Sequence, residues 1–321
     1  MEFTPQDAAK EARAADTRIR PLARETDLEP SPYYRDIGGA EVFFKLENLQ
    51  HTGSFKLRGA FNRLLTLSPE ARAAGCVTAS SGNHGAAVAW AMQALGVTGV
   101  IFVPEQTSPT KVDAIRRAGG DVRFFGTDGL DTETHARAFA ADEGMTYVSP
   151  YNDEQVVAGQ GSCGVEIARQ LSPVDAVFIA VGGGGLLSGV GAFLKSVNPD
   201  VEIVSCQPSA SRVMTDSVAA GEILDLPSLP TLSDGTAGGI EQGAITFDLC
   251  RELIDRFVVV DEEQIAVAMR DFIDTHHLLP EGAAGVALAG FLDIAADYAG
   301  KNVVIIICGG NISRDTLKKV I

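Results

Sequence analysis

The chain has 321 residues, of which 45% are hydrophobic and 21% charged, a composition ordinary for a globular protein. Its 26 basic and 42 acidic residues give a formal net charge of −16. This balance argues against nucleic acid and against a membrane surface as partners, since both attract basic proteins. A small molecule is therefore the expected ligand.

The cysteines and the N-terminal segment bear on the compartment. Five cysteines without a Cys-x-x-Cys pair predict neither a disulfide framework nor a zinc site. The first 20 residues mix charges, and no apolar run reaches the roughly 18 residues of a membrane span. We therefore expect a cytoplasmic protein whose thiols stay reduced.

In chain order, an opening helix is followed by strands that alternate with helices. Thr4 is a good N-cap and Pro5 suits the first helical position, so a helix should run to about Asp16. Helical signatures include residues 112–118 and 186–197. The apolar runs that predict strands are residues 42–46, 76–79, 99–103, 121–125, 146–148, 176–181, 202–206, 257–260 and 303–308. Such alternation predicts an α/β fold, with parallel strands covered on both faces. Residues 225–239 indicate a long loop over a cleft.

The segment 52–58 places Lys56 among small and apolar neighbours. Burial penalises an ammonium group and lowers its pKa, so a lysine in this setting can form a Schiff base with an aldehyde. An isolated lysine is more often a surface residue, because charged side chains are seldom fully buried. The motifs that follow in the chain favour the chemical interpretation.

Residues 80–85, Ser-Ser-Gly-Asn-His-Gly, follow a predicted strand and precede a helix predicted over 86–95. Their N–H groups and hydroxyls would lie at a helix N-terminus, where an anion such as a carboxylate is stabilised. A plain N-cap is the alternative interpretation of this segment.

Four glycines, Gly182 to Gly185, stand at another predicted strand-to-helix turn, and their unshielded amides suit a phosphate dianion. Cys308 ends the last predicted strand. Ligands in open α/β sheets collect beyond the carboxyl ends of the strands, so Ser80, Gly182 and Cys308 should converge.

On these motifs the chain resembles, over essentially its whole length, the serine racemase, serine dehydratase and threonine dehydratase family of pyridoxal phosphate enzymes. The resemblance implies fold type II, the tryptophan synthase β-like fold, with two open twisted, mostly parallel sheets flanked by helices. It implies a large cofactor-binding domain of residues 1–65 and 150–321, a small mobile domain of residues 66–149, and pyridoxal 5'-phosphate between them. A homodimer is expected.

The resemblance also assigns site residues by their place in the motifs. The catalytic residues it gives are Lys56, which holds the cofactor and acts as base, and Ser81. The cofactor-binding set it gives is Phe55, Lys56, Asn83, Gly182, Gly183, Gly184, Gly185, Leu186, Glu281 and Cys308. The substrate-binding set it gives is Ser80, Ser81, Asn83, His84 and Asn152.

Departures from the family pattern also matter. Members similar to serine racemase bind a divalent cation through an acidic pair, which reads Gln207 and Val213 here; neither supplies an anionic oxygen, so no metal site is expected. Cys308 replaces a serine found in many members, and a neutral thiol should leave the cofactor's pyridine nitrogen largely unprotonated. Residues 129–133 lack an arginine that some racemases have, which leaves the substrate side chain open.

The expected activity is dehydration of a β-hydroxy-α-amino acid such as threonine or serine to a 2-oxo acid and ammonia. One alternative is an amino-acid racemase of the serine type, because Ser81 stands where racemases deliver a proton to the opposite face. Another is dehydration of a specialised substrate, such as 3-hydroxyaspartate or another catabolic hydroxy-amino acid. A dinucleotide-binding interpretation of residues 183–188 fails, because it needs glycine where Ser188 stands and an acid where Cys206-Gln207 stand.

Overall fold

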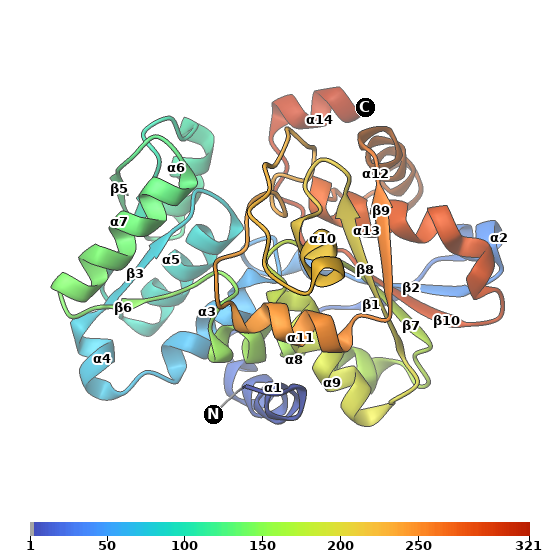
Figure 1. Cartoon of the computed structure of the whole chain (residues 1–321), viewed down its shortest axis with the longest axis horizontal. Helices are drawn as coiled ribbons and strands as arrows, with labels where there is room; N and C mark the ends of the chain where they lie inside the picture. The colour runs from blue at the N-terminus through green and yellow to red at the C-terminus, as the bar shows by residue number, and fades with distance from the viewer. Residues whose placement is uncertain (1–2) are drawn as a thin grey trace.

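The computed structural model describes residues 3–321 and contains two sheets flanked by helices (Figure 1). The larger sheet has the order β1-β2-β10-β7-β8-β9, parallel except for β1. Its strands are β1 (Leu28–Pro30), β2 (Glu41–Lys45), β7 (Ala176–Ala180), β8 (Glu202–Pro208), β9 (Arg256–Val260) and β10 (Asn302–Ile306). The smaller sheet, β5-β4-β3-β6, is entirely parallel. Its strands are β3 (Cys76–Ala79), β4 (Gly99–Val103), β5 (Asp121–Phe124) and β6 (Thr146–Tyr147).

Helices connect the strands and cover the sheets. Those before or around the smaller sheet are α3 (Lys56–Leu65), α4 (Pro69–Ala74), α5 (Asn83–Leu95), α6 (Pro109–Arg117) and α7 (Gly129–Asp142). The others are α1 (Pro5–Ile19), α2 (Pro32–Gly38), α8 (Glu154–Gln170), α9 (Gly185–Val197), α10 (Val213–Ala220), α11 (Ile245–Leu253), α12 (Glu262–His276), α13 (Gly282–Ile294) and α14 (Arg314–Val320), with 3-10 turns η1 (Glu47–Leu49) and η2 (Ala295–Tyr298). Figure 1 shows α1, α8 and α9 on one side of the larger sheet and α12 and α13 on the other. The predicted fold class is confirmed.

The predicted elements are found, with shifts at their ends. Thr4 caps α1 with a reciprocal bond to Asp7, and the helix continues three residues beyond the expected Asp16, because Ile19 is buried and extends the apolar face. The strand β1 was not predicted. It lies at the sheet edge, has only three residues, is mostly exposed and ends in Pro30, so it has no apolar run to reveal it.

The central strands of the smaller sheet, β3 and β4, are buried on both faces. Cys76 and Ile101 face one apolar cluster with α5, whereas the neighbouring Val77 and Val100 face another with α7. Alternation of side chains along each strand produces this division. All strands of this sheet lie between residues 76 and 147, within the range predicted for the small domain, residues 66–149.

The loop expected over residues 225–239 lies within a stretch without helix or strand between α10 and α11. No helix among residues 3–321 is both long and apolar enough to cross a membrane.

Helix α8 is packed against two other helices with almost no side chain between them. A Cβ atom on Gly159 would lie 2.6 Å from Cα of Gly59 in α3, and one on Gly161 would lie 2.9 Å from the carbonyl oxygen of Gly189 in α9. Glycine is therefore required at these crossings. Because α3 begins at Lys56 and α9 begins at Gly185, this packing fixes the start of both helices relative to α8.

A buried group of charged side chains lies beside these crossings. Glu166 of α8 accepts hydrogen bonds from Lys45 at 2.6 Å and from Arg58 at 2.7 and 2.8 Å, and all three side chains are 0% exposed. Burial alone would raise the pKa of Glu166, but the two cations outweigh it and lower the pKa to about 2.

Acid should remove the stability that Glu166 contributes. Its folded pKa lies below the ordinary value of 4.5, so the contribution is complete above about pH 4.5 and is lost as the pH falls toward 2. Denaturant unfolding measures the difference in the free energy of unfolding between the wild type and Glu166→Gln. This difference should shift against the wild type by on the order of 2 kcal/mol as the pH falls from 6 to 3. An advantage independent of pH would mean that Glu166 is not ionised in the folded protein.

Candidate active site

Lys56 lies where the chain enters α3, beside the end of β10. The N–H of Phe55 donates to the carbonyl oxygen of Cys308 at 3.0 Å, which ties the lysine segment to the residue that follows the last strand by two positions. The Nζ of Lys56 donates to the carbonyl oxygen of Pro150 at 2.9 Å and lies 5.1 Å from the centroid of the Phe55 ring. Three of the predicted cofactor residues are thus neighbours.

Burial decides the charge of both reactive groups here. It lowers the pKa of Lys56 from 10.5 to about 8, although negative charge on Cys308 and Glu281 would act in the opposite direction. Burial, together with the charge of Glu281, raises the pKa of the Cys308 thiol well above its usual range. The site therefore offers an amine that is partly neutral at physiological pH and a thiol that is neutral.

Asn83 and Glu281 form a polar contact between the start of α5 and the start of α13. Asn83 Nδ2 donates to both carboxyl oxygens of Glu281 at 2.9 Å. Burial raises the pKa of Glu281 to about 7, against hydrogen bonds from Asn83 and Asn311 that lower it. The carboxyl group therefore changes its charge near neutral pH.

Asn311 is a member of this group that the sequence analysis missed. Its Nδ2 donates to Oδ1 of Asn83 and to the carbonyl oxygen of Thr52, each at 2.8 Å, and its backbone N–H donates to Glu281 at 3.2 Å. Both polar ends of the Asn83 amide are thereby oriented. The available signal was its place at the end of the Gly309-Gly310 turn after the last strand.

The N-terminus of α5 carries the predicted substrate residues. The helix begins at Asn83, three residues earlier than predicted, and Oγ of Ser80 accepts the N–H of Gly82 at 3.2 Å. The first-turn N–H groups of a helix lack intrahelical acceptors, so those of residues 83–85 can bind an anion. Ser80 and Ser81, both half-buried, lie directly before this turn.

His84 has a different chemical character from the one a carboxylate site suggests. Its ring is 3% exposed, and Nε2 contacts the carbonyl oxygen of Val148 at 3.0 Å, so Nε2 is the donor. Burial and the charge of Lys56 lower its pKa to about 3. The imidazole is therefore neutral. The group of His84 that can bind a substrate carboxylate is the backbone N–H.

The glycine turn between β7 and α9 has space only for backbone. A Cβ atom on Gly183 would overlap the ring of Tyr151, and one on Gly182 would lie 3.0 Å from Cα of Thr236. Gly184 is the N-cap of α9 and has φ +84°, a conformation that favours glycine.

Since α9 begins at Gly185, its first-turn N–H groups, including that of Leu186, have no partner within the helix. A phosphate dianion suits this turn because backbone donors and the helix dipole both favour negative charge. Pro150 and Tyr151 link the turn to Lys56: one accepts from the lysine and the next packs on the glycines.

Asn152, the last predicted site residue, supports the site from one side. Its Oδ1 accepts the N–H of Ile245 at 3.0 Å and so caps α11, while its own N–H donates to Oγ of Ser149 at 3.0 Å. Only its Nδ2 remains for another partner.

The strand ends thus bring together a lysine of lowered pKa and a turn suited to a phosphate, with an oriented amide between the start of α5 and that of α13. These features match one class of protein, the fold-type II enzymes that use pyridoxal 5'-phosphate. The family model described as "Pyridoxal-phosphate dependent enzyme" matches residues 19–309. The chain belongs to this family.

Relatives and solved structures agree. The chain is 39% identical to an L-threonine ammonia-lyase of Geobacter sulfurreducens over 96% of this chain and 76% of that protein. A threonine deaminase isoform 2 of Solanum lycopersicum superposes with a TM-score of 0.93 at 36% identity, covering 98% of this chain and 92% of that one. Maize serine racemase superposes with a TM-score of 0.92 at 31% identity, covering 97% of this chain and 95% of that one. The predicted family and cofactor are confirmed.

The pKa of Lys56 predicts how the apoenzyme captures its cofactor. Only the neutral amine attacks the aldehyde, so the rate of covalent attachment of pyridoxal 5'-phosphate should rise with pH around a midpoint of about 8. Stopped-flow absorbance measures this rate. Glu281→Gln removes a charge that raises the lysine pKa and should lower the midpoint; a midpoint above 10 would show that the amine is solvated.

Gln207, where the family's cation ligand would stand, is an internal cross-link. Its Nε2 donates to the carbonyl oxygen of Val181 at 3.0 Å, and its Oε1 accepts from both N and Oγ1 of Thr215 at 2.7 Å. Both ends of the amide are used within the protein, and no anionic oxygen is supplied.

Chelation should therefore leave turnover nearly unchanged. Dialysis against a chelator, followed by an assay with and without added magnesium, tests this expectation. A loss of more than about fivefold that magnesium restores would show that other oxygens bind a divalent cation.

Proposed function

We propose that this protein is a pyridoxal-phosphate dependent dehydratase that converts threonine, or a similar β-hydroxy-α-amino acid such as serine, into a 2-oxo acid and ammonia. The observation that supports this most is the 39% identity, over 96% of the chain, with a protein named L-threonine ammonia-lyase. The threonine deaminase fold neighbours support it as well.

The residues that would hold the cofactor are those assigned above. Lys56 would bind its aldehyde, Gly182 to Gly185 with Leu186 its phosphate, and Cys308 would lie at the pyridine nitrogen, with Phe55 against the ring. When bound, the cofactor supplies the electron sink for the substrate's Cα–H bond. The protein supplies position and the movement of protons.

The proton steps depend on Lys56. Once the substrate amino group has taken the place of Lys56 at the aldehyde, the freed Nζ, neutral because burial lowers the pKa to about 8, removes the Cα proton of the substrate. The hydroxyl leaves from Cβ as water after it accepts a proton from the protonated Lys56 or from the cofactor's phosphate, and hydrolysis of the remaining enamine by water gives the 2-oxo acid and ammonia. The neutral thiol of Cys308 would leave the pyridine nitrogen of a bound cofactor largely unprotonated, which would favour prompt elimination.

Substrate orientation would come from the N-terminus of α5. The first-turn N–H groups of Asn83 and His84 and the hydroxyls of Ser80 and Ser81 suit the α-carboxylate, whose charge the helix dipole stabilises. Because the His84 imidazole is neutral, this recognition relies on backbone donors rather than on a cationic side chain.

Racemisation is the second candidate, favoured by the likeness to maize serine racemase and by Ser81 in the segment where racemases deliver a proton from the opposite face. Specialised substrates such as 3-hydroxyaspartate are a further alternative.

We also propose a small mobile domain of residues 66–149 and a cytoplasmic homodimer. The five cysteines are buried and unpaired, which supports a reducing compartment. Leu49 and Leu279 are exposed apolar residues on neighbouring segments, joined by the hydrogen bond from Asn48 to the carbonyl oxygen of Leu279, and they support an interface between two copies of the chain.

The variants Ser81→Ala and Lys56→Ala separate the two candidates. Ser81→Ala should retain appreciable keto-acid release from one enantiomer and lose any racemase side activity, whereas Lys56→Ala should lose elimination by several orders of magnitude while staying folded. The assay follows both enantiomers and the 2-oxo acid for each variant. Racemisation faster than keto-acid release in the wild type would transfer the function to the racemase alternative.

A further inference from the structure

Arg58, the third residue of α3, is held by two carboxylates at once. Its Nε and Nη2 donate to the two carboxyl oxygens of Glu47 at 2.8 and 2.7 Å, and its Nη1 and Nη2 donate to those of Glu166 at 2.8 and 2.7 Å. Nη1 also donates to Oγ of Ser162 at 3.1 Å. The planar guanidinium is thereby fixed in orientation as well as in position.

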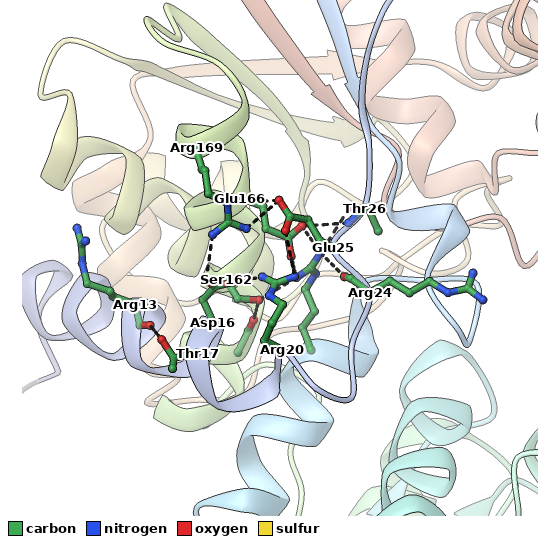
Figure 2. A network of polar contacts seen from close by, with 12 residues as sticks. Arg13, Asp16, Thr17, Arg20, Arg24, Glu25, Thr26, Ser162, Glu166 and Arg169 are labelled. Carbon is green, nitrogen blue, oxygen red and sulfur yellow. Dashed lines mark hydrogen bonds and ion pairs between the residues drawn. The ribbon is translucent and has the colours of Figure 1, made fainter.

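The fully buried members of the cluster balance in charge. Lys45, Glu47, Arg58 and Glu166 are each 0% exposed, and they provide two positive and two negative charges. Figure 2 shows its outer side, where Arg20, at the end of α1, points toward Glu166, 2.8 Å from Nη1 to Oε1.

Stability alone does not account for this cluster. Apolar residues of the same volume often give equal or greater stability than a buried ion pair, because desolvation offsets the attraction. What such side chains cannot give is a fixed direction. A bidentate guanidinium between two carboxylates determines how α3 is rotated and how far it is shifted along its axis.

Arg58 itself and its partner Glu47 both connect to the active site. Arg58 is two residues from Lys56 in the same helix. Glu47 belongs to η1, in which the N–H of Asn48 donates to the carbonyl oxygen of Ile307 at 2.9 Å, directly before Cys308. The cluster therefore connects the lysine segment and the segment of the thiol through one buried group.

We propose that Arg58, held by Glu47 and Glu166, is a positioning residue that sets Lys56 relative to Cys308 for cofactor capture and proton transfer. The inference rests on Lys56 being the cofactor lysine. Displacement of a reacting group by about 1 Å can cost on the order of a hundredfold in rate, so a loosened α3 affects chemistry before it affects the fold.

The test compares Arg58→Lys and Glu47→Gln with Arg20→Met. Arg58→Lys keeps the charge but loses the paired bonds, whereas Arg20→Met removes a partner of the same Glu166 from a helix that does not carry the lysine. Three quantities are measured: the rate at which each apoenzyme captures pyridoxal 5'-phosphate, the visible circular dichroism of the bound cofactor, and kcat and KM. The melting temperature is recorded for each variant.

Arg58→Lys should slow capture by at least about tenfold, weaken the visible dichroism and lower kcat by about 10- to 100-fold with KM within about threefold. Glu47→Gln should change the same quantities less. Arg20→Met should stay within about twofold even where its melting temperature falls.

Arg58→Lys and Glu47→Gln are the network variants. The proposal would be overturned if they matched Arg20→Met in capture rate, dichroism and kcat at similar melting temperatures. Failure of both network variants to fold would overturn it as well. Borohydride reduction of the wild-type holoenzyme, which fixes the cofactor to the side chain that holds it, tests the lysine assignment separately from the role of Arg58. A label absent from Lys56 would refute the underlying lysine assignment, whereas a label on Lys56 with unaltered capture in the network variants would refute only the role of Arg58.

Discussion

The close packing of α3 and α9 on α8 is the constraint on which the rest of the site depends. Gly59 meets Gly159 and Gly161 meets Gly189 with no room for a side chain, so the three helix axes are fixed to within the contact distance of their backbones. Lys56 begins one of these helices, and the glycine turn proposed to bind phosphate leads into another. The distance between Lys56 and the glycine turn follows from these backbone contacts. The glycine contacts leave α3 free to rotate about its axis, and we propose that the ion cluster around Arg58 fixes this rotation.

Burial then determines the chemistry by removing charge. The same desolvation lowers the pKa of Lys56 to about 8, keeps Cys308 a neutral thiol and keeps His84 a neutral imidazole. Anions would be bound instead by backbone N–H groups at the starts of α5 and α9, which carry partial positive charge without an ionisable side chain. The site thus holds an amine of lowered pKa beside two turns proposed to bind anions, and the charges that act on this amine come from Cys308 and Glu281.

Much of this arrangement was predictable from sequence because it is local. The strand ends before Ser80, Gly182 and Cys308 follow from apolar runs and glycine turns, and parallel topology brings the ends before Gly182 and Cys308 to one edge of the larger sheet. Ser80 follows β3 of the smaller sheet, so its approach to the other two depends on how the two sheets pack, which no local pattern encodes. The early start of α5 and the edge strand β1 were not predictable, since neither has an apolar pattern.

The roles of Asn311 and Arg58 depend on contacts far apart in the chain. Asn311 meets Asn83 across 228 positions, and Arg58 meets Glu166 across 108. No local period encodes such pairs. The neutrality of His84 likewise depends on its burial and on the charge of Lys56, whereas the motif alone suggests only a polar residue near a carboxylate.

The central claim is that Lys56 is the residue that binds pyridoxal 5'-phosphate. Borohydride reduction of the purified holoenzyme, followed by proteolysis and mass spectrometry of the peptides, locates the reduced cofactor on one side chain. The account predicts a single modified peptide that contains Lys56. A cofactor attached to another lysine, with the peptide of Lys56 unmodified, would contradict it.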